Sequence, residues 1–91
     1  MARILIKGTQ IAVPNTVGAG TSFSEATLVR LVNTATGVDH VVTVQETQGG
    51  TTVGTFTILR GSVEILEKQV AHTVSVNAGS AVLGAKVGYT N

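Results

Sequence analysis

Several residue types that small proteins use for stability or chemistry are absent or rare in this chain of 91 residues. It has no cysteine and no tryptophan, a single proline, and only three aromatic residues: Phe23, Phe56 and Tyr89. Without cysteine there are no disulfides, thiolate metal sites or cysteine nucleophiles. Because small exported domains usually carry disulfides, we expect synthesis in a reducing cytoplasm.

Charge is also scarce, since Asp, Glu, Lys and Arg make up 12% of the residues and the net charge is +1. No cluster of Lys or Arg forms a stripe that would follow a phosphate backbone, so we expect no nucleic-acid partner. The apolar run Ile4–Leu5–Ile6 is far shorter than a signal peptide core or a membrane span. We therefore expect a complete, soluble chain with no membrane partner.

What is abundant is valine and threonine, with fifteen and fourteen copies, separated by eleven glycines. These β-branched residues favour strands, and glycine allows the turns between them. The chain therefore predicts a single all-β domain over residues 1–91, built as a small antiparallel β-sandwich of seven to eight short strands, immunoglobulin-like or jelly-roll in type. The expected strands are residues 3–7, 10–13, 26–33, 40–47, 52–59, 62–68, 73–76 and 81–89. Residues 15–24 are the longest expected loop, a flexible or partner-facing segment.

Candidate catalytic and metal-binding groups are scattered. His40 and His72 are the only histidines, and a metal site would need them together with a third ligand such as Asp39 or Glu46. Lone polar histidines at strand ends are more common. Glu64 and Glu67 would point to opposite faces of a strand, as would Asp39 and His40. We therefore expect no enzyme activity, no cofactor and no metal.

Apolar residues on both faces of several strands predict a surface for assembly. Residues 26–33 are apolar on both faces, with Arg30 among them, and the edge at residues 3–7 could accept a neighbouring strand. Arg30 is either an outward-facing solvated residue, which we favour, or a salt-bridge partner across a subunit interface. The candidate interface residues are Arg3, Ile4, Leu5, Phe23, Leu28, Arg30, Val53, Leu59, Leu66 and Tyr89.

Four stretches carry a resemblance to a known class of proteins: ILIKGTQIAVP at 4–14, VRLVNTAT at 29–36, GSVEILEKQVAHTVSV at 61–76 and GAKVGYTN at 84–91. They resemble small virion structural proteins of tailed marine bacteriophages of the cyanophage type. The resemblance implies a β-sandwich located in the virion, a capsid decoration (cement) protein that binds and stabilises the head shell. The implied partners are the major capsid protein or tail proteins, and further copies of the chain.

Two alternatives stay open. The chain is a small tail-associated component, or it is a carbohydrate-binding or adhesin module of the β-sandwich type. Such modules usually stack sugars on exposed aromatic rings, and only Phe23, Phe56 and Tyr89 are available for this.

Overall fold

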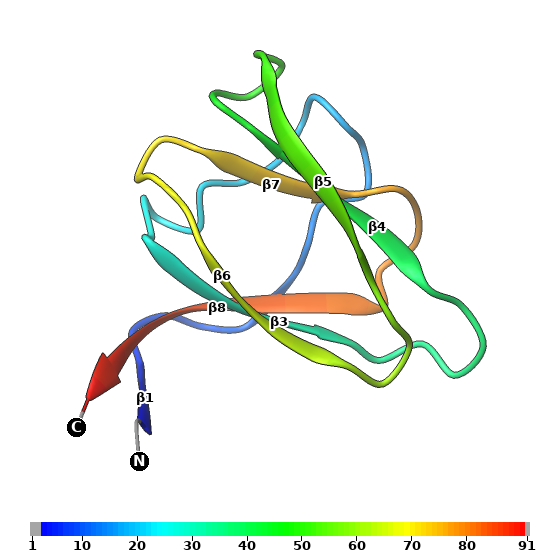
Figure 1. Ribbon diagram of the computed structural model, residues 1–91, viewed down its shortest axis with the longest axis horizontal. Helices are drawn as coiled ribbons and strands as arrows, with labels where there is room; N and C mark the ends of the chain where they lie inside the picture. The colour runs from blue at the N-terminus through cyan, green and yellow to red at the C-terminus, as the bar shows by residue number, and fades with distance from the viewer. Residues whose placement is uncertain (1–2, 91) are drawn as a thin grey trace.

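The protein folds as two antiparallel β-sheets packed face to face (Figure 1). The computed structural model describes the backbone of residues 3–90 and the side chains of residues 4–88, and contains no helix within that range. The strands are β1 (Arg3–Ile6), β2 (Ile11–Ala12), β3 (Leu28–Asn33), β4 (His40–Gln45), β5 (Thr52–Ile58), β6 (Val63–Glu67), β7 (Thr73–Val76) and β8 (Val82–Thr90). The predicted all-β sandwich is confirmed, and each expected strand is present within a few residues of its predicted ends. The narrower assignment to an immunoglobulin-like or jelly-roll type stays a prediction.

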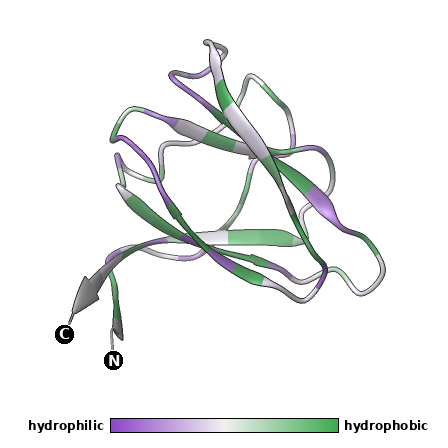
Figure 2. Ribbon diagram, in the orientation of Figure 1, coloured by the Kyte–Doolittle hydropathy of each residue, from purple (hydrophilic) through white to green (hydrophobic). Residues whose placement is uncertain are grey.

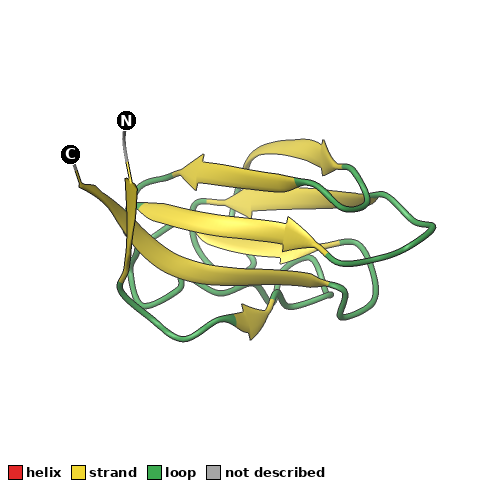
Figure 3. Ribbon diagram, turned by 90° about the horizontal axis from the view of Figure 1, so that it is seen from below, coloured by secondary structure: helices red, strands yellow, loops and turns green. Residues whose placement is uncertain are grey.

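The larger sheet has the strand order β1-β8-β3-β6, with the short β2 also pairing with β8. The smaller sheet has the order β5-β4-β7. The two sheets form layers, and β1 with the end of β8 extends away from the body at the corner where both termini lie (Figure 3). The hairpin of β4 and β5 and the long strand β8 account for the largest paired regions.

The expected loop at residues 15–24 is attached to the smaller sheet along β7. The amide of Val74 donates to the Thr21 carbonyl over 2.9 Å, and the Thr21 amide returns a bond of 3.1 Å. Just before this segment, the Pro14 carbonyl accepts from the Val76 amide over 2.8 Å. The loop therefore satisfies the otherwise unpaired edge of β7.

The core between the sheets is built almost entirely from aliphatic side chains. The inner faces of the strands contribute Val29, Leu31, Val42, Ile58, Val74, Val76 and Val82, and connecting segments add Val13, Phe23 and Ala26. Phe56 and Leu66 pack against this cluster from the side. A core made of small branched residues is thin, which fits the modest burial available to a chain of this length.

The side chain of Asn33 is fully buried and joins the two sheets. The Nδ2 atom of Asn33, at the end of β3, donates to the carbonyls of Ile58 over 3.0 Å and Val38 over 3.1 Å. Its Oδ1 atom accepts from the Ala35 amide over 3.0 Å. Because the Nδ2 and Oδ1 atoms both have hydrogen-bond partners, burial of this amide costs little free energy. The bond to the Ile58 carbonyl holds β3 against the end of β5.

Phe23, expected at an interface, is instead the only aromatic side chain buried in the described core, at 5% exposure. Phe23, Ser24 and Glu25 all have positive φ angles of 53° to 57°, which turn the chain sharply and direct the ring inward. The ring lies over Gly84 of β8, where an added Cβ atom would stand 2.7 Å from the ring. Because glycine has no side chain, Gly84 leaves the space that the Phe23 ring occupies.

Substitution of Gly84 by alanine tests this contact. Because the added methyl group overlaps both the ring and the Leu31 side chain, we expect Gly84→Ala to lower the free energy of unfolding by about 1–3 kcal/mol. Gly54→Ala is the matched control, because a Cβ atom at Gly54 meets nothing within 4 Å. We expect the control to change stability by less than about 0.5 kcal/mol in chemical denaturation. Equal effects of the two substitutions would show that the ring does not depend on the glycine.

Candidate interaction surfaces

The side of the larger sheet that faces away from the smaller sheet is largely apolar. The pairing register sets Val32 of β3 beside Leu83 of β8 and Val63 of β6, and Ile6 of β1 beside Val87. Residues paired directly across antiparallel strands point to the same side of the sheet. We call this surface the outer face; its apolar members are Ile4, Ile6, Leu28, Val32, Val63, Ile65, Leu83, Ala85 and Val87.

Several side chains of the outer face are open to solvent. Ile6 is 63% exposed, Val63 45% and Ile4 38%. The members nearer the middle of the sheet are half-buried by one another, and Ala85 and Val87 are buried. Hydropathy colouring shows hydrophobic residues along β3, β6 and β8 (Figure 2). A contiguous apolar patch of this kind is typical of an interaction site, whereas single exposed apolar residues are not.

Arg30 lies in the middle of the outer face, between Ile65 of β6 and Ala85 of β8. Its side chain is half-buried and forms no hydrogen bond or salt bridge with another described residue. The outward orientation that we favoured from sequence is therefore confirmed. The guanidinium leaves one unpaired positive charge in an apolar surface, so a partner that covers this face must supply an acceptor. The salt bridge across a subunit interface stays a prediction.

The two ends of the described chain form a projecting pair of strands, which we call the terminal arm. In this arm β1 pairs with the last part of β8, from Ile6 opposite Val87 to Arg3 opposite Thr90. The pairing of β3 with β8 reaches only to Lys86, so the arm extends beyond the rest of the sheet. Leu5 is 50% exposed on the side of the arm opposite to Ile4 and Ile6. A two-stranded ribbon with apolar residues on both sides gains stability from a neighbour.

The structure brings only some of the predicted interface residues together. Ile4, Leu28 and Arg30 share the outer face. Leu5 lies on the reverse side of the arm, and Val53 and Leu59, 54% and 56% exposed, belong to β5 and the turn that follows it. The side chains of Arg3 and Tyr89 lie outside the described residues.

One of the predicted interface residues, Phe23, is corrected by the structure, and a second, Leu66, is partly buried and lies away from the outer face. Phe23 is buried in the core, and Leu66 packs against that core from β6. Leu66 points inward because β6 alternates, with Val63 and Ile65 facing out. Sequence reasoning also did not single out Ile6, Val63, Ile65, Leu83 or Val87, the members that make the outer face contiguous. The alternation of side chains along β6 and β8 indicates which residues share a face. The sequence of a single strand does not indicate which of its two faces is buried.

A groove with a volume of about 440 Å³ opens between the free sides of β5 and β6. Its walls include Val53, Phe56, Leu66 and the side chain of Lys68. The Lys68 Nζ atom donates to the Ala26 carbonyl over 2.7 Å and to the Gln69 carbonyl over 3.3 Å. Burial of the ammonium, with a smaller contribution from the positive charge of Lys86, lowers the pKa of Lys68 below its usual value of 10.5.

The hydrogen bonds of this lysine give it a structural role. Its ammonium is held by two carbonyl oxygens, which position it as a structural link between β6 and the segment before β3. The only salt bridge among the described residues joins Arg60 and Asp39 over 3.6 Å at the surface. Glu67 and His72 line the same groove as Lys68, and neither forms a salt bridge with it among the described residues.

The two histidines lie at opposite ends of the β4–β7 pair. His40 begins β4, and its Nδ1 atom lies 3.1 Å from the Asn77 Oδ1 atom. His72 directly precedes β7, beside the other end of β4. No group of three or more potential metal ligands occurs among the described residues. Glu64 and Glu67 face opposite sides of β6, as predicted.

The depressed pKa of Lys68 predicts how stability changes with pH. The folded chain holds the Lys68 proton less tightly than the unfolded chain, so the free energy of unfolding contributed by this group rises as pH increases toward 10.5. We expect urea titrations at a series of pH values between about 7 and about 10 to show that the free energy of unfolding rises more steeply with pH for the wild type than for Lys68→Met. Identical slopes for the two proteins would contradict this assignment.

No helix in the described part of the chain is long and apolar enough to cross a membrane. Comparisons of the chain with protein-family models, with curated proteins and with solved structures found no match.

Proposed function

We propose that this chain is a non-enzymatic structural subunit of a tailed-phage virion, a decoration protein that docks on the head shell through its outer face. The observation that carries the proposal is the contiguous apolar surface formed by β1, β3, β6 and β8. The resemblance of four stretches to phage virion proteins supplies the identity of the particle. A position on the tail, with tail proteins as partners, is the alternative placement.

The energetics of the outer face fit docking on a repetitive particle. Strands about 4.8 Å apart that rise about 3.3 Å per residue give this face at most about 400 Å². Burial at about 25 cal/mol per Å² then contributes about 10 kcal/mol before association costs of about 4–15 kcal/mol are subtracted. A single contact of this size is weak, so a rigid shell that holds many copies side by side suits it better than a free partner.

Docking would also stabilise the chain itself. A thin aliphatic core gives the chain a small free energy of unfolding. A partner that binds only the folded state shifts the folding equilibrium toward that state. By the same linkage, the chain would stabilise the shell conformation to which it binds. This reciprocal effect is the physical basis of a cement function.

The described aromatic residues do not favour the carbohydrate-binding alternative. Phe23 is buried in the core, and Phe56 packs against it from the side. The buried Phe23 ring offers no surface for sugar stacking, and the partly buried Phe56 ring lies in the wall of the groove between β5 and β6. We therefore retain the structural function as the conclusion.

A pair of valine substitutions tests the docking face on purified particles of the phage that encodes the chain. Val63 lies on the outer face and is 45% exposed, while Val53, 54% exposed, lies on β5 of the smaller sheet. Because a lysine at an apolar interface must lose its hydration, we expect Val63→Lys to weaken binding to the particle by about tenfold or more. Binding is measured by co-sedimentation with particles that lack the protein.

Val53→Lys is the matched control and is expected to bind within about twofold of the wild type. Mass spectrometry of clean wild-type particles establishes whether the protein is present in them. Its absence from such particles, or equal binding by the two variants, would overturn the proposal.

A further inference from the structure

The larger sheet ends in β6 on one side and in β1 and the short β2, both paired with β8, on the other; no described strand pairs with the outer edge of β1 or β6. The cross-strand hydrogen bonds near β6, such as Lys68 amide to Thr27 carbonyl and Asn33 amide to Ser62 carbonyl, all lie on its β3 side. The Lys7 amide likewise bonds toward β8, to the Lys86 carbonyl over 2.9 Å. Open edges of this kind accept a strand from another chain.

We infer that the chain associates with further copies of itself by antiparallel pairing of β1 of one copy with β6 of the next. Neighbouring strands in the order β1-β8-β3-β6 are all antiparallel. The directions of β1 and β6 are therefore opposite within one copy. Copies placed side by side in the same orientation consequently present an antiparallel β1–β6 pair without any turning of the molecule.

The backbone groups fix which residues of the two edges can pair. The amides of residues 62–68 and 3–7 alternate in direction, so those of Val63, Ile65 and Glu67 point to the free edge of β6, and those of Ile4 and Ile6 to the free edge of β1. The pairs Ile6–Ile65 and Ile4–Glu67 satisfy this pattern. The same pairing keeps the outer faces of the two copies on one side.

Side-chain chemistry selects this register among those that the backbone allows. With Ile6 opposite Ile65, Leu5 stands opposite Leu66 and Lys7 stands opposite Glu64. A shift by two residues in one direction sets Leu5 against Glu64, and the opposite shift sets Lys7 against Leu66. The chosen register therefore combines two apolar pairs with one pair of opposite charges, and it also sets Ile4 opposite Glu67 and Arg3 opposite Lys68.

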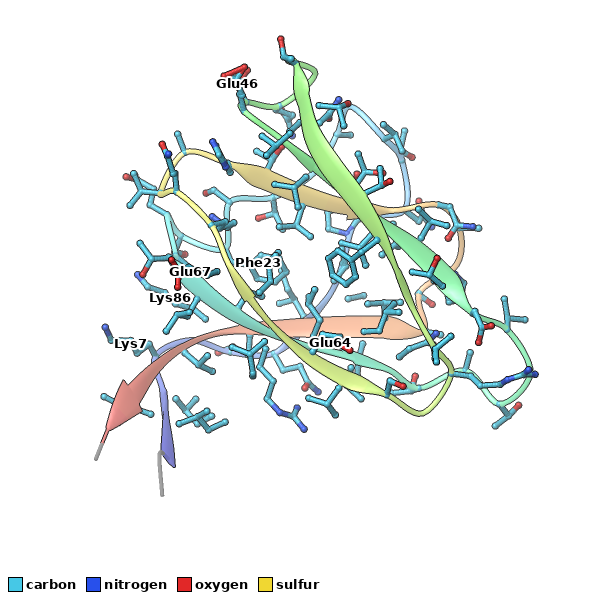
Figure 4. All side chains as sticks on the ribbon, viewed as in Figure 1. Lys7, Phe23, Glu46, Glu64, Glu67 and Lys86 are labelled. Atoms are coloured by element: carbon cyan, nitrogen blue, oxygen red, sulfur yellow. The ribbon has the colours of Figure 1, made fainter. Side chains whose placement is uncertain are left out.

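Charge also favours the pairing of unlike edges over a symmetric dimer. Residues 3–7 carry only positive charges, Arg3 and Lys7, and β6 carries only negative ones, Glu64 and Glu67. Pairing of β6 with β6, or of β1 with β1, sets like charges along the same edge. Figure 4 shows Lys7 at the terminal arm and both glutamates along β6. Electrostatic complementarity of this kind contributes more to the choice of binding partner than to the affinity of binding.

The contact is heterologous, because two different edges meet, so repetition produces a ring or an open filament. The outer faces of successive copies then join into one wider apolar surface. This inference concerns copies of the chain alone, so it stands or fails independently of the proposed docking on a phage particle.

Charge reversal tests the pairing in sedimentation-velocity experiments on the purified full chain over a range of concentrations. We expect the wild type to self-associate as concentration rises. Lys7→Glu and Glu64→Lys should each raise the Kd for self-association by about fivefold, because an attractive pair becomes a repulsive one. The double variant that carries both substitutions should return to within about twofold of the wild-type Kd.

Glu46→Lys is the matched control, since Glu46 is an exposed glutamate between β4 and β5, away from both edges. We expect it to leave the Kd unchanged within about twofold. Circular dichroism of each variant verifies the fold.

Hydrogen exchange on the wild type provides a readout that needs no substitution. We expect the amides of Ile4, Ile6, Ile65 and Glu67 to exchange more slowly at high protein concentration than at low concentration. A wild-type chain that stays monomeric at millimolar concentration, or a double variant no better than the single ones, would overturn the inference. So would concentration-independent exchange at these amides.

Discussion

The seating of the Phe23 ring on Gly84 is the contact on which the arrangement of the larger sheet depends. The ring occupies the space that a side chain at Gly84 would take, which places Val82, Gly84 and Lys86 on the inner side of β8. Leu83, Ala85 and Val87 must then face outward. The same contact that completes the core therefore also creates an apolar surface on the opposite side of the strand.

This division explains how the chain presents a contiguous apolar surface outside its core. The inner faces of the two sheets supply a thin aliphatic core, fixed at one end by the fully satisfied Asn33 amide. The outer face repeats the same residue types without a covering element. Both proposals use surfaces of this one sheet: its outer face for a particle, and its edges β1 and β6 for further copies.

Strand positions were predictable because alternation and turn residues are local signals. The segment 62–68, which contains several good helix formers, is a strand as predicted, since it is short and lies between a glycine and another strand-like run. Phe23 was misplaced because its inward direction comes from three consecutive positive φ angles, which no pattern announces. Lys68 was not singled out because its burial depends on the Ala26 carbonyl, 42 residues away along the chain.

The sequence by itself determined the all-β class and the strand positions, because both follow from residue composition and local periodicity. Only the tertiary structure decided which face of each strand is inside. Strands such as β3 and β8 are apolar on both faces, so the alternation of apolar and polar residues does not indicate which face is buried. The long-range contact of Phe23 with Gly84 lies on the inner side of β8, so the alternate residues of that strand face outward, while the strand order leaves β1 and β6 at the two sides of the sheet.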